Sequence, residues 1–246
     1  MSRFILVAAI LLSSLAVAQE KVNVSFEWSF ATLTQTTKDW SLVPITRDTA
    51  LHSGDQLKMM VHLNRECFVY VLHEGPGGEI SLRFPYDLKQ FASGYKVGVN
   101  YYIPKGRAWF KLDTTIGRET IYLLASTQRL LDLEALVAKY NDAPASKKPE
   151  ISKSIVSEIR NVRRYYKSFT TIAERPISIG GNVRGMTKEP SSSFPDVAQI
   201  ATEINANNFY GKTVTLDHKE RAIGLGHSRF DGGLVCSHPP AFLDPS

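Results

Sequence analysis

The chain has 246 residues, enough for one large domain or two small ones, and its 43% hydrophobic and 22% charged residues are typical of a soluble globular protein. The formal net charge is +5, and most of the excess lies between Lys139 and Arg175, where nine basic residues accompany four acidic ones. Attraction to an acidic partner would therefore come from one segment. After the N-terminal region, no segment is apolar for long enough to span a membrane.

The N-terminus has the features of a secretory signal peptide, predicted over residues 1–18. Arg3 supplies a short positive region, Phe4–Leu15 is an apolar core of suitable length, and Ala16-Val17-Ala18 offers the small residues that a signal peptidase accepts. A membrane anchor is the alternative, but the apolar core is short for crossing a bilayer. We therefore expect a periplasmic or secreted protein that begins at Gln19, where no cysteine is present to carry a lipid anchor.

Two cysteines, Cys67 and Cys236, lie far apart in the sequence. Disulfides are permitted in an exported protein, but a bridge here would have to tie the C-terminal tail to a core strand. The favoured interpretation is a buried thiol at Cys67 and an incidental one at Cys236. A domain of this size can bury a sufficient core without disulfides.

The first part of the mature chain is a series of predicted short strands. Alternating apolar residues predict a strand over 22–30, followed by a polar loop over 32–38. An apolar stretch from Trp40 then ends near Pro44, since proline marks a strand edge or a break. Ser53-Gly54-Asp55 is a turn signature before the next strand, predicted over 56–63.

The clearest hairpin signal joins strands 67–73 and 79–84 through Gly75-Pro76-Gly77-Gly78, where glycine permits positive φ and proline ends a ladder. A turn at 64–66 would pair strand 56–63 with strand 67–73. Both strands are apolar on two faces, which is typical of central strands that are covered on both sides. The face that needs a cover would carry Met60, Phe68, Tyr70 and Leu72.

Further strands are predicted over 97–103, 108–112 and 119–126, so six to eight short strands separated by turns indicate an antiparallel sandwich. Residues 127–170 instead predict an inserted helical hairpin, in which the breaker-rich stretch 141–149 joins two helices. The second helix has one apolar face, which we expect to cover the exposed sheet face; fewer than three heptads is short for a coiled coil. That helix face consists of Ile151, Ile155, Ile159, Val162, Tyr166 and Phe169.

After the helices the chain is expected to return to the sandwich core, which would comprise residues 19–126 and 171–218. The returning segment is predicted to hold strands over 171–179 and 209–216. A short helix from Asp196 through Asn205 is expected between them. The remaining residues, 219–246, have several glycines and prolines and no periodicity, so they predict a disordered tail.

Short motifs between Leu51 and Ser126 occur in an order that resembles a bacterial domain family of unknown function. They are Leu51-His52-Ser53-Gly54-Asp55, Tyr70-Val71 followed by Gly77-Gly78-Glu79, Phe84-Pro85, Tyr102-Ile103-Pro104, and Gly117-Arg118-Glu119 before Ala125-Ser126. Members of that family occur alone after signal peptides or beside caspase-like peptidase or kinase domains. The resemblance covers less than a third of the chain and implies an immunoglobulin-like fold, but no catalytic residues. We therefore expect a mainly β protein with α: an antiparallel immunoglobulin-like β-sandwich carrying an inserted helical hairpin.

No catalytic, cofactor-binding or metal-binding residue is predicted. Residues 226–230 (GHSRF) lack the final glycine and the preceding strand of a nucleophile elbow. His52, His62 and His73 lie near one hairpin, but His62 and His73 would sit toward opposite ends of a strand pair, which does not suit zinc. Three acids at strand ends or in loops are expected to be solvated: Glu79, Asp87 and Asp113.

The side of the second helix opposite its apolar face is basic. It carries Lys153, Arg160, Arg163, Arg164 and Lys167. These residues are the candidate partner-binding site, for an envelope protein or an anionic envelope polymer, although the same pattern also fits the solvated side of a packed helix. Nucleic acid is not an expected partner, because the chain is predicted to be exported and has no reader motif.

The sequence thus predicts a non-catalytic exported interaction or scaffold module of the bacterial cell envelope. The alternative is an envelope enzyme or enzyme inhibitor with a site built from loops. A deep cleft that gathers Asp, His or Arg side chains would favour this alternative.

Overall fold

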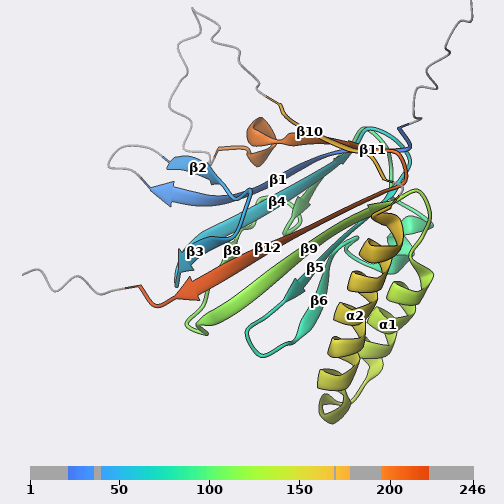
Figure 1. The fold of residues 1–246 in the computed structure, drawn as a ribbon. Helices are drawn as coiled ribbons and strands as arrows, with labels where there is room; N and C mark the ends of the chain where they lie inside the picture. Colours follow the sequence, from blue (N-terminus) through green and yellow to red (C-terminus); the bar gives the residue numbers. More distant parts are fainter. Residues whose placement is uncertain (1–21, 36–39, 169, 178–194, 222–246) are drawn as a thin grey trace, which may run out of the picture.

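The computed structural model describes residues 22–35, 40–168, 170–177 and 195–221, which form two β-sheets and a pair of helices (Figure 1). The predicted signal peptide, the GHSRF motif, Cys236 and the tail beyond residue 221 lie outside these ranges. Within them, no helix has both the length and the apolar character needed to cross a membrane.

The first sheet has seven strands. Its order is β10-β11-β1-β4-β7, with β2 also paired to β1 and β8 paired to β4, and all these pairs are antiparallel. The strands are β1 (Val24–Gln35), β2 (Trp40–Pro44), β4 (Gln56–Leu63), β7 (Asn100–Ile103), β8 (Phe110–Lys111), β10 (Ile172–Pro176) and β11 (Thr202–Ala206).

The second sheet has five strands in the order β3-β12-β9-β5-β6. Its pairs are antiparallel except that β12 runs parallel to β3. The strands are β3 (Thr49–His52), β5 (Phe68–Glu74), β6 (Ile80–Phe84), β9 (Gly117–Ser126) and β12 (Phe209–Lys219). The hairpin predicted over 67–84 is therefore present, as β5 and β6. The predicted start of the tail at residue 219 falls inside β12.

The predicted pairing of strand 56–63 with strand 67–73 is wrong. Strand β4 pairs with β1, β7 and β8, whereas β5 pairs with β6 and β9 in the opposite sheet. The segment between them carries the chain from one sheet to the other, and the backbone N–H groups of Asn64 and Arg65 both donate to the carbonyl of Ser25 during this crossing. Both strands are nevertheless apolar on two faces, because each sheet has the core on one side and a cover on the other.

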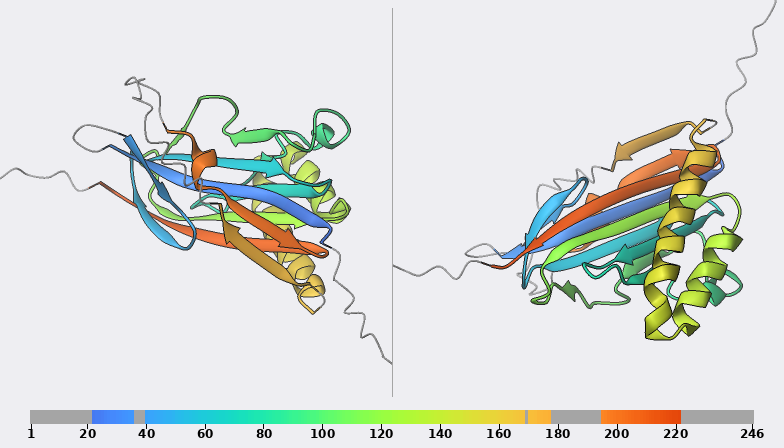
Figure 2. Two further views of the ribbon diagram at one scale, coloured as in Figure 1. Left: turned by 90° about the horizontal axis from the view of Figure 1, so that it is seen from above. Right: turned by 60° about the horizontal axis from the view of Figure 1, so that its bottom comes forward.

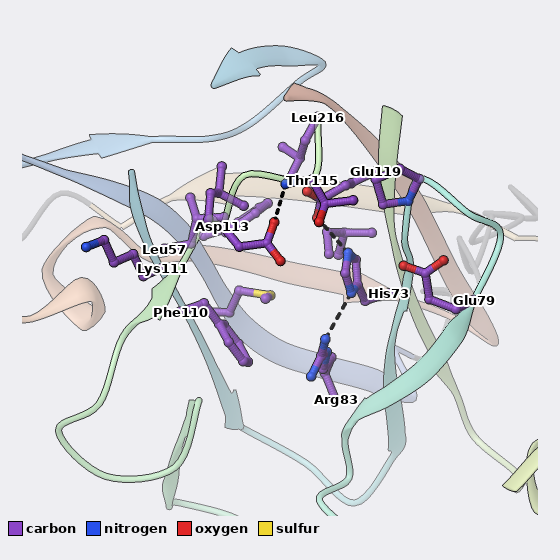
Figure 3. A pocket seen from close by; sticks show the side chains of 15 residues that line it. Leu57, His73, Glu79, Arg83, Phe110, Lys111, Asp113, Thr115, Glu119 and Leu216 are labelled. Carbon is purple, nitrogen blue, oxygen red and sulfur yellow. Dashed lines mark hydrogen bonds and ion pairs between the residues drawn. The ribbon is translucent and has the colours of Figure 1, made fainter. Parts of the chain in front are cut away.

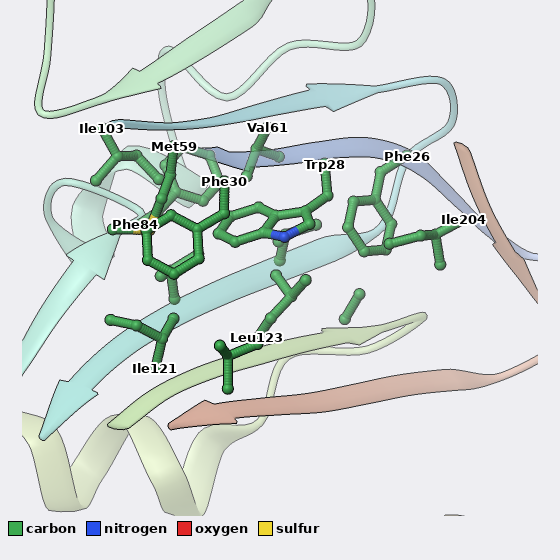
Figure 4. Close-up of a cluster of buried hydrophobic side chains, with 14 of the residues drawn as sticks. Phe26, Trp28, Phe30, Met59, Val61, Phe84, Ile103, Ile121, Leu123 and Ile204 are labelled. Atoms are coloured by element: carbon green, nitrogen blue, oxygen red, sulfur yellow. The ribbon is translucent and has the colours of Figure 1, made fainter. Parts of the chain in front are cut away.

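The core lies between the two sheets (Figure 4). Val24, Phe26, Trp28 and Phe30 of β1 alternate inward, as the sequence predicts, and meet side chains such as Leu123 of β9. Strand β1 continues past Phe30 through Gln35, so the loop predicted from residue 32 begins too early. Residues 32–35 pair with β2, residues 32 and 33 also pair with β4, and these ladders hold the segment extended.

The outer face of the five-stranded sheet is covered by α1 (Leu131–Asp142) and α2 (Lys148–Tyr166) (Figure 2). Phe68, Tyr70 and Leu72 of β5 lie in one apolar cluster with the helices, as predicted. The prediction is wrong for Met60, because β4 belongs to the other sheet. Met60 instead packs beneath the short 3-10 helix η3 (Val197–Ile200).

Two further predicted boundaries differ from those in the structure. Both helices extend into the linker predicted over 141–149: α1 ends at Asp142, and α2 begins at Lys148. Pro149 is tolerated in the first turn of α2 because an N–H group at that position has no intrahelical acceptor. The helix predicted from Asp196 to Asn205 is only η3, with Asp196 as its N-cap. From Thr202 onward the chain is strand β11, which pairs with β1 and β10. The remaining short 3-10 helices are η1 (Leu88–Phe91) and η2 (Ala145–Lys147).

Candidate functional site

The five basic residues predicted on α2 are all exposed, and four of them surround one hollow. Arg160, Arg163, Arg164 and Lys167 line an open depression of about 510 Å³ at the C-terminal end of α2, which we call the basic hollow. Lys153 lies about two helical turns earlier and does not line it. The helical periodicity therefore predicts the cluster, with Lys153 as its outlying member.

The floor of the basic hollow is built by β12. Phe209 stacks on Tyr166 with ring centroids 4.8 Å apart and planes 8° apart. A Cβ at Gly211 would lie 3.1 Å from Cγ of Arg163, so the glycine lets the arginine stem lie close to the strand. The guanidinium of Arg163 then donates to Oγ1 of Thr213 at 2.8 Å, which holds it at the rim. Sequence reasoning missed this contribution because β12 begins more than forty residues after α2 ends.

The positive charge of the basic hollow is not neutralised within the described part of the chain. There, no carboxylate oxygen lies within 4.0 Å of a side-chain nitrogen of Arg160, Arg163, Arg164 or Lys167. Arginine forks match the geometry of carboxylate and phosphate oxygens, and they bind such groups through two parallel hydrogen bonds. The hollow is thus a surface to which an anionic group can bind.

A second concave site lies between the sheets, where side chains of β1 and β4 face those of β9 and β12 (Figure 3). This inter-sheet cavity has a volume of about 300 Å³ and combines an apolar wall with charged side chains. His73, Glu79 and Asp113, which sequence reasoning treated as unrelated, all line it, whereas Asp87, His52 and His62 do not. Three further charged residues of this site were missed: Arg83, Lys111 and Glu119.

Glu119 is the centre of a hydrogen-bonded chain beside the inter-sheet cavity. Its Oε2 lies 2.7 Å from Nε2 of His73, and its Oε1 lies 3.1 Å from Nδ1 of His218. His73 Nδ1 accepts from Arg83 at 3.0 Å, and His218 Nε2 lies 3.1 Å from Oγ of Ser53. Because arginine can only donate, the proton of neutral His73 is on Nε2 and points at Glu119.

The same environment determines the charge state of Glu119. Burial raises the pKa of its carboxyl group, but hydrogen bonds and charge from His73 and His218 outweigh burial and hold the pKa below its ordinary value. Burial also lowers the pKa of Arg83, an effect that the charge of Glu119 partly offsets. The inward position of Glu119, in register with Ile121 and Leu123, is the one sequence signal that indicates a buried carboxylate here.

Ser53, His218 and Glu119 have the connectivity of a hydrolase triad, in which a base is oriented by a carboxylate and contacts a hydroxyl. The nearby backbone donors are already used, however. The N–H of Ser53 donates to the carbonyl of Lys219, and that of Gly54 donates to the carbonyl of Leu112. Ser53 also does not line the inter-sheet cavity. The local geometry therefore provides no free pair of N–H groups beside Ser53 for an oxyanion.

Metal binding and thiol chemistry find little support in the described ranges. They contain no group of three or more His, Cys, Asp or Glu side chains placed to hold a metal ion. Cys67 is a free, buried thiol, and burial raises its pKa to about 11. A thiol of this kind is a poor nucleophile at neutral pH, since the thiolate is the reactive form.

The described chain is thus a two-sheet β-sandwich with a helical hairpin on one outer face, a basic hollow and a charged cavity. Residues 50–129 match the family described as domain of unknown function (DUF4384). The predicted resemblance to a domain family of unknown function is confirmed. No curated protein and no solved structure matches the chain.

The matched residues are not a complete sandwich by themselves. They run from β3 to the residues before α1 and include Ser53, His73, Arg83 and Glu119. Strand β1, which pairs with β4, and strand β12, which lies between β3 and β9, come from outside the match. The domain therefore depends on flanking strands in this chain, and the basic residues of α2 also lie outside the matched residues.

Proposed function

We propose that the protein is a non-catalytic, exported interaction or scaffold module of the bacterial cell envelope. Through the basic hollow it contacts an anionic partner, either an envelope protein or an anionic envelope polymer. The observation that carries the proposal is the set of four cationic side chains around one hollow without carboxylate partners in the described chain. Export, and with it a periplasmic or secreted location, is supported by the N-terminal sequence.

The chemistry of the hollow favours phosphate or carboxylate groups. Three of its cations are arginines, which bind oxyanions with defined geometry, and the stacked Tyr166 and Phe209 rings place an apolar surface beside them. Exposed ion pairs are screened by salt, because the Debye length falls from about 30 Å at 0.01 M to about 3 Å at 1 M ionic strength. Binding should therefore weaken steeply with salt.

Charge reversal tests the proposal. Arg160→Glu, Arg164→Glu and Lys167→Glu together should lower the affinity for polyphosphate or polyglutamate by ~100-fold at low salt, taking about 1 kcal/mol for each lost pair. These three side chains are exposed, so the fold should be retained. Affinity can be measured by fluorescence anisotropy of labelled polymers over a salt series.

A matched control carries the same change of net charge elsewhere. Arg47→Glu, Lys96→Glu and Arg107→Glu alter three exposed residues that do not line the hollow. This control variant should keep most of the affinity of the unmodified protein. If both variants lost affinity for the polymers equally, net charge, and not the basic hollow, would determine binding. Unchanged binding in the α2 variant would refute the proposal.

A second candidate function is a hydrolase, because Ser53, His218 and Glu119 are linked as in a triad and a charged cavity lies beside them. We expect no reaction at Ser53, since the adjacent N–H groups are committed to other carbonyls. Incubation with a fluorophosphonate probe, followed by peptide mass spectrometry, provides the measurement. Labelling at Ser53 that disappears in His218→Ala would establish the hydrolase and remove the non-catalytic part of the proposal.

A further inference from the structure

The inter-sheet cavity has the construction of a small-molecule site. Its wall is apolar and comes from both sheets, with Phe30, Leu57 and Met59 on one side and Ile121 and Leu216 on the other. A volume of about 300 Å³ is at the lower end of the range for ligand pockets, and corresponds to about ten water molecules at ~30 Å³ each. A ligand that enters the cavity would bury its apolar part against this wall.

Arg83 is the polar group best placed to hold such a ligand. Its guanidinium lies over the ring of Phe110, 5.0 Å from the centroid, and one nitrogen donates to Nδ1 of His73. In the described chain no carboxylate is within salt-bridge distance of it. An arginine has five N–H donors, so most of those of Arg83 are available to an anion in the cavity. Figure 3 shows Arg83 and Phe110 side by side at the edge of the cavity.

Glu119 cannot serve as the counter-ion by direct contact, because both its oxygens are occupied by His73 and His218. It instead holds His73, and His73 holds Arg83. This arrangement keeps the guanidinium half-buried and in a fixed orientation, with no carboxylate of the described residues bonded to it. A half-buried cation of this kind gains from an oxyanion that accepts two parallel hydrogen bonds.

The other charges limit the ligand to a single negative charge. Glu79 and Asp113 also line the cavity. These two carboxylates outweigh the one further cation there, the exposed Lys111, and would repel a second negative charge. A phosphate dianion is therefore disfavoured, whereas a carboxylate with an apolar tail satisfies both the wall and Arg83. We propose that the inter-sheet cavity binds a small amphiphilic monocarboxylate, whose tail lies between the sheets and whose carboxylate is held by Arg83.

The two methionines of β4 provide a direct test. Met59 lines the cavity, whereas its neighbour Met60 is buried on the opposite face of the strand beneath η3. In protein labelled with ¹³C at the methionine methyl groups, octanoate should shift the Met59 signal saturably and leave the Met60 signal in place. Octanoate has about ten non-hydrogen atoms, which suits a pocket at the small end of the usual range. Met59→Leu and Met60→Leu assign the two signals.

Ligand and protein variants separate the role of the charge from that of the tail. Octanol and octylammonium should bind at least ~10-fold more weakly than octanoate, and Arg83→Gln should weaken octanoate by at least ~10-fold. The comparison of ligands uses the unmodified protein, so it holds even if Arg83→Gln does not fold. The proposal is overturned if Met59 does not respond, if Met60 responds equally, or if octanol binds as tightly as octanoate.

This site is independent of the basic hollow, which lies outside the cavity and shares no lining residue with it. The charge-reversal variant of α2 should therefore bind octanoate normally. Loss of polymer binding with octanoate binding intact would support both proposals. Failure of one binding activity would leave the other standing.

Discussion

Ile159→Ala should lower the free energy of unfolding by about 2–5 kcal/mol, the range for truncating a fully buried aliphatic side chain. Ile159 has no exposed surface and lies in the cluster formed by α1, α2 and the outer face of the five-stranded sheet. Truncation would remove contacts on both sides and leave a cavity at the helix–sheet interface. Urea unfolding followed by circular dichroism measures the change, with the slope of the transition as a check for two-state behaviour.

Leu131→Ala is the matched control, because it also truncates an aliphatic helical residue. Leu131 begins α1 and is 63% exposed, so its truncation should change the free energy of unfolding by less than about 0.5 kcal/mol. If Ile159→Ala cost no more than Leu131→Ala, the helices would not be covering the sheet, and the interpretation of the second apolar face would fail.

Polar contacts orient the helices on the sheet. The hydroxyl of Tyr70 donates to Oε1 of Glu134 at 2.6 Å and accepts from the N–H of Leu130 at 3.0 Å. The hydroxyl of Tyr140 accepts from the N–H of Ile80 at 3.1 Å. Each buried phenol therefore has partners, and burial together with Glu134 raises the pKa of Tyr70. Apolar burial accounts for most of the stabilisation, whereas these bonds determine where the helices dock.

The helical cover could be predicted from the sequence because its pattern is local. Apolar residues at intervals of three and four define one face of α2, and the arginines follow on the other face within the same nineteen residues. Hairpin β5–β6 was predictable for the same reason, since its turn residues lie between its strands. Short-range periodicity contains all the information that these predictions require.

The pairing of β4 could not be predicted in this way. A three-residue connection between two apolar strands fits a hairpin and also fits a crossing between sheets, and both alternatives give strands that are apolar on two faces. The choice depends on β1, which pairs with β4 along eight residues and precedes it by more than twenty. The error also placed Met60 on the wrong sheet. Periodicity reports which faces are buried and not which partner buries them.

The charged cavity was missed for a related reason. His218 and Glu119 are 99 residues apart, and His73 and Glu119 are 46 apart, so only the sheet order β12-β9-β5 brings the three side chains together. In the sequence, Glu119 carries only the signal of an inward register, and His218 lies near the predicted end of the ordered chain. The candidate basic residues were found because one helix carries them all.

Glu119→Gln should destabilise the protein by about 1–3 kcal/mol at neutral pH, the cost of weakening charge-assisted hydrogen bonds at a buried site. The pKa of Glu119 is lowered on folding, so its stabilising contribution is complete above the unfolded-state pKa near 4.5 and is lost as the pH falls through the lower folded-state value. The difference in unfolding free energy between the unmodified protein and the variant should therefore shrink on acidification below about pH 4.5. Urea unfolding over a pH series measures this difference.

The control is Asp113→Asn, which removes an exposed carboxylate at the same cavity and should leave the stability and its pH dependence within about 0.5 kcal/mol of the unmodified protein.

In Glu119→Gln the amide oxygen can accept from Nε2–H of His73, but the NH₂ group then faces Nδ1 of His218. That contact is favourable only if His218 moves its proton to Nε2 and donates to Oγ of Ser53. ¹⁵N shifts of the His218 ring would report the tautomer. A constant difference in stability at all pH values would show that Glu119 acts through packing and not as the charged centre of the chain.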